Sequence, residues 1–114
     1  MFGLLKSHKE KELGLKNFSK WGRKIDASRR NPQATFIAHS QMLAEYNKLN
    51  TPEQKLYAAY ISLDSVLIGS IKQELALVSR EDRRKSVQII YDILEEQGKH
   101  GCSSLLQGHY KNDV

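Results

Sequence analysis

Residues 51–78 read TPEQKLYAAYISLDSVLIGSIKQELALV, and this stretch carries the strongest structural signal in the chain. Thr51 and Gln54 have the spacing of a capping box, which begins a helix by satisfying two of its free N–H groups. Apolar residues then recur at three- and four-residue intervals, and only one charged residue stands between positions 56 and 71. Because a helix that is apolar on most sides is normally buried, the stretch predicts one central, buried helix.

Asp64 is the single charged residue inside that apolar run. A carboxylate that faces a core needs a hydrogen-bonding partner or a raised pKa. Our hypothesis is that Asp64 faces solvent as a notch in the apolar stripe. The alternative is a buried hydrogen bond to Tyr46, Tyr57 or a histidine.

Three further helices are predicted around the central one. Asn31 and Ser79 are both suited to the N-cap position of a helix, and Gly98 is suited to the position just after a helix end. Apolar residues recur at helical spacing after each of these starts. The predicted helices cover residues 7–29, 32–49 and 79–97.

The whole chain therefore predicts an all-α fold, a three- or four-helix bundle in one domain that spans residues 1–114. Short connections favour antiparallel neighbours. The segments 1–7 and 99–114 lack clear periodicity, and we expect flexible or loosely docked tails there. The single cysteine, Cys102, excludes an internal disulfide. No signal-peptide pattern and no run of about 20 apolar residues is present, so the expected location is the cytoplasm.

The positive charge of the chain is concentrated near its N-terminus. The formal net charge is +5, and residues 1–31 hold nine Lys or Arg against three Asp or Glu. A localised basic segment suggests an anionic partner, such as nucleic acid, a membrane surface or an acidic protein. The alternative is a solvated face that only keeps the protein soluble.

The predicted N-terminal helix is basic and amphipathic. On a helical wheel, one side is mostly apolar and the opposite side is mostly basic. The sequence leaves open whether the helix packs in the bundle or projects from it. The apolar stripe offers Phe18, Trp21 and Ile25 as partner-binding residues. The anion-binding candidates are Lys9, Lys16, Lys20, Arg23, Lys24 and Arg30, with a second cluster of Arg80, Arg83, Arg84 and Lys85, and the two clusters could form one phosphate-binding corner.

The sequence contains no recognisable catalytic, metal or cofactor motif. His100, Cys102 and His109 share one segment, but their spacing matches no structural zinc pattern and a fourth ligand is missing. We therefore expect a non-enzymatic protein with no metal, no cofactor and no small-molecule substrate.

The expected function is binding of another protein through an apolar helix surface, in the manner of an adaptor, an inhibitor or a regulatory factor. A homodimer is a variant of this expectation, because small bundles often complete their core by self-association. The first alternative is nucleic-acid binding through the basic clusters, with salt-sensitive affinity. A further alternative is peripheral attachment to an anionic membrane surface.

Overall fold

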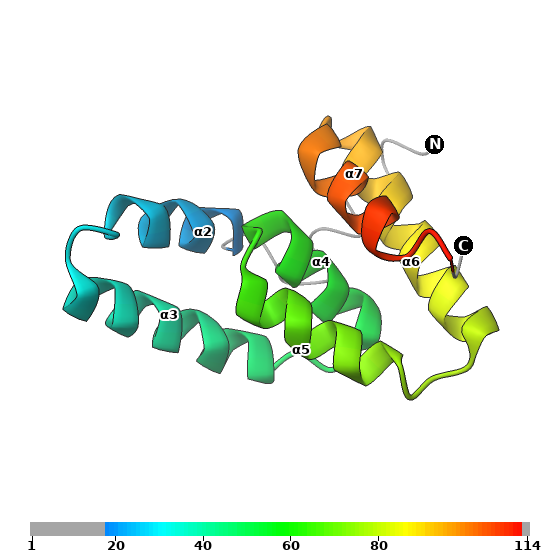
Figure 1. Cartoon of the computed structure of the whole chain (residues 1–114), viewed down its shortest axis with the longest axis horizontal. Helices are drawn as coiled ribbons and strands as arrows, with labels where there is room; N and C mark the ends of the chain where they lie inside the picture. The colour runs from blue at the N-terminus through cyan, green and yellow to red at the C-terminus, as the bar shows by residue number, and fades with distance from the viewer. Residues whose placement is uncertain (1–17, 113–114) are drawn as a thin grey trace.

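The computed structural model describes residues 18–112, and this part of the chain is built from helices and contains no strand. The all-α prediction is therefore confirmed. Figure 1 shows the arrangement of the helices. Their bounds are Phe18–Ala27 for α2, Pro32–Asn47 for α3, Pro52–Ser62 for α4, Ser65–Leu75 for α5, Arg80–Glu96 for α6 and His100–His109 for α7.

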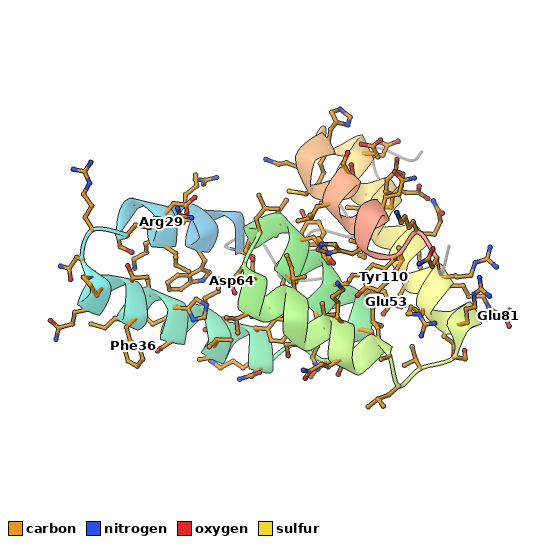
Figure 2. All side chains as sticks on the ribbon, viewed as in Figure 1. Arg29, Phe36, Glu53, Asp64, Glu81 and Tyr110 are labelled. Atoms are coloured by element: carbon orange, nitrogen blue, oxygen red, sulfur yellow. The ribbon has the colours of Figure 1, made fainter. Side chains whose placement is uncertain are left out.

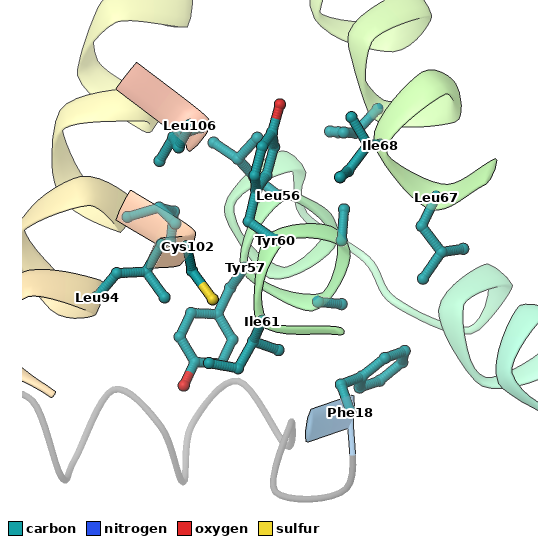
Figure 3. Packing of buried hydrophobic residues seen from close by; sticks show 14 of the residues in the cluster. Phe18, Leu56, Tyr57, Tyr60, Ile61, Leu67, Ile68, Leu94, Cys102 and Leu106 are labelled. Atoms are coloured by element: carbon teal, nitrogen blue, oxygen red, sulfur yellow. The ribbon is translucent and has the colours of Figure 1, made fainter. Parts of the chain in front are cut away.

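Helix α4 lies at the centre of the fold and contacts α2, α5, α6 and α7. Every residue from Leu56 to Ser62 is buried, and Tyr57 and Tyr60 are among the largest fully buried side chains. Figure 3 shows these side chains packed between the surrounding helices. The predicted capping box is present, because the Thr51 hydroxyl accepts from the Gln54 N–H and the Gln54 side chain accepts from the Thr51 N–H.

Polar side chains of α4 connect it to its neighbours at four points. Each donor has its own acceptor at the edge of the core, and these contacts help to fix the register of the helices. The contacts are Ser86 Oγ to Glu53 (2.9 Å), Lys55 Nζ to Glu74 (2.9 Å), Tyr57 Oη to Gln97 (2.7 Å) and Tyr60 Oη to His109 Nδ1 (2.7 Å).

The prediction of one continuous helix over residues 51–78 is wrong, because the helix breaks between α4 and α5. Leu63 adopts a left-handed conformation with φ of 55° and ends α4. Asp64 then begins α5 as its N-cap, and its Oδ1 accepts from the N–H groups of Val66 and Leu67 at 3.0 Å each. The break lets α5 turn back and pack against α4, and Leu67, Ile68, Ile71 and Leu75 of α5 are buried.

Residues 100–109 form α7, where the sequence pattern predicts only a flexible or loosely docked tail. Cys102, Leu106 and Tyr110 are spaced four residues apart and are all buried against the core. Gly98, at φ of 72°, allows the chain to reverse after α6. The Lys99 N–H donates to Leu94 O at 2.8 Å, which completes the predicted glycine-based helix end.

Helices α2 and α3 form an antiparallel hairpin at one side of the molecule (Figure 1). The connecting turn is closed by Thr35, whose hydroxyl donates to Ser28 O at 2.7 Å. Asn31 acts as the predicted N-cap of α3 and accepts from the Ala34 N–H. The hairpin is joined to the body of the fold by the packing of α2 against α4 and by a contact between His39 and Asp64.

Candidate functional site

The apolar stripe of α2 packs on the bundle. Phe18 is 4% exposed and belongs to the core, while Trp21 and Ile25 are half-buried against it. Gly22 allows this close packing, since a Cβ atom there would lie 2.7 Å from the carbonyl oxygen of Ser62. The described part of the N-terminal helix is therefore docked, and two of its predicted partner-binding residues keep only part of their surface accessible.

The basic residues of α2 keep their side chains in solvent. Lys20, Arg23, Lys24 and Arg30 are all exposed. Lys24 Nζ also lies 4.9 Å from the centre of the Trp21 ring, a cation–π contact that covers the outer face of the indole. Lys9 and Lys16 lie outside the residues that the structure describes.

The second basic cluster lies at the opposite end of the molecule. Arg80, Arg84 and Lys85 are exposed, whereas Arg83 is half-buried and donates to the carbonyl oxygens of Leu75 and Val78 at the end of α5. Figure 2 shows Arg29, in the turn after α2, and Glu81, in the first turn of α6, at opposite ends of the longest axis. The two clusters do not form a common phosphate-binding corner, because the body of the fold separates them.

A hollow of about 420 Å³ lies where α2, the end of α4 and α7 meet. Its wall carries Arg23, Arg29 and Lys99, with Asp26 as the carboxylate among them. Arg29 pairs with Asp26 at 3.0 Å. Burial raises the pKa of the Cys102 thiol, which also lines this hollow, and the Lys99 ammonium partly opposes that effect. A protonated thiol is a poor nucleophile, so this geometry does not favour cysteine catalysis.

A second hollow, of about 360 Å³, lies between α5, α6 and the end of α7. It is lined by Lys72, Ala76, Arg83, His109 and Tyr110. The buried Tyr60 holds the imidazole of His109 through the 2.7 Å hydrogen bond between its hydroxyl and Nδ1, and the two rings meet edge to face. The sequence pattern does not identify Lys72 as a site residue. Lys72 and His109 are 37 positions apart in the chain, and only the packing of α5 and α7 around α4 brings them together.

His39 and Asp64 form a half-buried pair between α3 and the start of α5. His39 Nε2 lies 3.0 and 3.2 Å from the two carboxylate oxygens, and the two side chains are 23% and 12% exposed. The hypothesis that Asp64 is a solvent-facing notch is wrong, and the alternative of a hydrogen bond to a histidine is confirmed. Because the same carboxylate caps α5, this pair is best explained as a structural connection.

A carboxylate-centred cluster joins α6 to α7. Glu95 accepts hydrogen bonds from His100 Nδ1, from the Ser103 hydroxyl at 2.8 Å and from the Tyr91 hydroxyl at 3.2 Å. These hydrogen bonds, chiefly that of His100, lower the pKa of Glu95. A serine nucleophile would need the histidine beside it as a base, whereas here both groups bind the carboxylate. The cluster therefore stabilises the α6–α7 corner.

The outer face of α3 exposes Phe36 and Ile37, two apolar residues of the predicted helix 32–49 that the sequence pattern does not identify as a binding surface. Phe36 is 72% exposed and Ile37 is 52% exposed, and Figure 2 shows Phe36 pointing away from α2. Residues 31–44 contain no Asp, Glu, Lys or Arg. Five exposed residues of this segment lie along one side of the helix, and we call them the α3 face: Phe36, Ile37, Ser40, Gln41 and Ala44. The missed signal was the absence of charge from the whole segment.

Within residues 18–112, no three potential ligands among His, Cys, Asp and Glu come together as a metal site. Over the same residues, no helix combines the length and the apolar character needed to cross a membrane. Comparison of the chain with protein-family models, with curated proteins and with solved structures finds no match.

Proposed function

We propose that this protein binds another protein, and that the α3 face is the binding surface. The observation that carries the proposal is the exposure of Phe36 beside Ile37 on a helix face without charged groups. Aromatic residues are enriched at the centres of protein interfaces, where they bury a large area at a small entropic cost. The opposite side of α3 buries Ala38, Met42 and Tyr46, so a rigid backbone presents the exposed residues.

The chemistry of the α3 face indicates the kind of partner. An ionic group buried against this uncharged surface would lose its hydration and gain no counter-charge. The partner surface is therefore apolar and uncharged where it meets Phe36, such as a groove or a helix stripe of a different protein. Polar contacts at the edge of the interface are available from Ser40 and Gln41.

Site-specific photocrosslinking in the native host tests the proposal. Phe36 is replaced by the photoreactive analogue p-benzoylphenylalanine, and the same analogue at Gln88, on an exposed position of α6, serves as the matched control. We expect one discrete protein adduct from position 36, none from position 88, and loss of the adduct when Ile37→Asp is added.

Three results would contradict this proposal. Equal adducts from both positions would show non-specific capture, and an adduct that survives Ile37→Asp would show that the α3 face is not responsible. An adduct with the mass of two chains would assign the face to a second copy instead of a different protein.

Nucleic-acid binding is a second candidate, favoured by the exposed cations of α2 and the turn after it. Lys20, Arg23, Lys24 and Arg30 are exposed, and the nearby Asp26 is paired with Arg29. Cations on such a surface would neutralise phosphates and release counterions, so affinity would fall steeply as salt rises. A gel-shift titration with DNA and RNA at low salt tests this candidate, and absence of any shift would remove it.

A further inference from the structure

The hollow between α5, α6 and the end of α7 gathers basic side chains from three parts of the chain. Lys72 lies on α5, Arg83 on α6 and His109 at the end of α7. No Asp or Glu is found among the described residues that line this hollow. Lys72 forms no ion pair with any residue that the structure describes. Lys72 and Arg83 are cations beside one concavity, and a bound anion would offset their mutual repulsion.

The imidazole of His109 is held in place by a buried tyrosine, Tyr60. Tyr60 is fully buried, its hydroxyl lies 2.7 Å from His109 Nδ1, and the neighbouring Tyr110 hydroxyl interacts with Tyr60. Burial raises the pKa of Tyr60, so its hydroxyl stays protonated, and its hydrogen bond with Nδ1 orients the ring whichever of the two atoms is the donor. In the tautomer whose Nδ1 accepts from Tyr60, and also in the imidazolium form, Nε2 carries a proton and is a donor.

The charge of Lys72 acts on His109 in this arrangement. Burial lowers the pKa of His109, and the positive charge of Lys72 lowers it further. A bound dianion would reverse the second effect, because a negative charge close to the ring favours the imidazolium form. The hollow therefore offers an ammonium and an imidazole N–H, with the Arg83 guanidinium in its wall, held there by hydrogen bonds to Leu75 O and Val78 O.

We propose that this hollow binds the phosphoryl dianion of inorganic phosphate or of a phosphate monoester, with Lys72 and His109 as the ligand-binding residues. Its volume of about 360 Å³ is at the lower end of the range for small-molecule pockets. That volume accommodates a phosphoryl group with a small attached alcohol. The site is independent of the α3 face, so its test does not depend on the proposed protein partner.

Nuclear magnetic resonance of the full chain at low ionic strength tests the site. Inorganic phosphate is titrated while the His109 ring signals are followed, and the His109 pKa is measured with and without phosphate. We expect saturable binding and a rise in the His109 pKa when phosphate is bound. Lys72→Gln should weaken binding about tenfold by removing one charge-assisted contact, and His109→Gln should weaken it as well.

Lys48→Gln is the matched control, because Lys48 is exposed at the end of α3 and does not line the hollow. Equal weakening by Lys72→Gln and Lys48→Gln would reduce the effect to net charge and overturn the proposal. Absence of saturable binding by the unaltered chain would overturn it as well.

Two further ligands distinguish the sources of the phosphoryl group. Glycerol 3-phosphate should bind at least as tightly as inorganic phosphate, with the same dependence on Lys72. An oligonucleotide without a terminal phosphate presents only phosphodiester monoanions and should not shift the His109 signals. An oligonucleotide that bound here while both phosphate ligands failed would contradict a monoester site.

Discussion

Leu63 provides the sharpest test of the break between α4 and α5. It is the one non-glycine residue of positive φ among residues 18–112, with φ of 55°, and it is 55% exposed. We compare Leu63→Gly with Leu63→Ala, because both variants lose the leucine side chain and differ only in the conformations they favour. In the left-handed conformation glycine is preferred over alanine, whereas inside a helix the preference is reversed.

The expected difference follows from two opposing terms. The left-handed conformation costs an L-residue such as alanine about 1–2 kcal/mol that glycine avoids. Glycine loses more freedom on folding, which offsets about 0.4–1 kcal/mol of that advantage. Leu63→Gly should therefore be more stable than Leu63→Ala by about 1 kcal/mol. A continuous helix through position 63 would instead make the glycine variant about 1 kcal/mol less stable.

Guanidinium denaturation followed by circular dichroism at the helix band measures the difference. The free energy of unfolding of each variant is obtained by linear extrapolation, and equal slopes confirm that the unfolded states are comparable. The melting temperature of the glycine variant should be about 4 °C higher for a chain of this size. If the alanine variant proves as stable as the glycine variant or more so, the helix break is refuted.

Three further predictions concern packing, capping and pH. Gly22→Ala should destabilise the fold by about 2 kcal/mol, because its Cβ would meet the carbonyl oxygen of Ser62 at 2.7 Å. Gly69→Ala should stabilise the fold by about 1 kcal/mol, because a Cβ there would have nothing within 4 Å and alanine favours the helix. Thermal melts that rank the two variants in the opposite order would contradict this packing. Asp64→Ala should lower the free energy of unfolding by about 2 kcal/mol, because it removes both the helix cap and the contact with His39. Asp64→Asn still caps the helix and should lower it by about half as much, as measured by urea unfolding. Equal losses of stability in the two variants would argue against the capping role. The pKa of Glu95 is lowered in the folded protein, so the ionised carboxylate stabilises the fold above its unfolded pKa of about 4.5, and this stabilisation is lost as pH falls through the lower, folded pKa. On acidification, the urea midpoint of Glu95→Gln should therefore fall less than that of the unaltered protein. Parallel curves of urea midpoint against pH would disprove this link between Glu95 ionisation and stability.

The starts of α3, α4 and α6 and the all-α class could be predicted because their causes are local. The capping box of Thr51 and Gln54, the N-caps Asn31 and Ser79, and the reversal at Gly98 each depend on residues within one helical turn. The same local pattern failed at Leu63, because apolar periodicity continues through a break when both halves of the stretch are buried. Periodicity reports burial, and it does not report the direction of the chain.

The candidate sites were less accessible to sequence reasoning. The stripe of Phe18, Trp21 and Ile25 was identified as apolar, but whether such a stripe meets a partner or its own core depends on how α2 packs against α4. The exposure of Phe36 was hidden for the same reason, since α3 has apolar residues on both sides and only the packing selects the buried one.

The amino-acid sequence by itself determined the helical class, the helix caps at Asn31, Thr51 and Ser79, the buried character of residues 56–62 and the concentration of positive charge near the N-terminus, because each depends on composition or on neighbours along the chain. Tertiary structure alone decided which apolar face stays in solvent and which distant side chains meet. Lys72 and His109 share one hollow because α5 and α7 both fold back beside α4. Helix packing angles and chain reversals set such distances, and no spacing within the sequence encodes them.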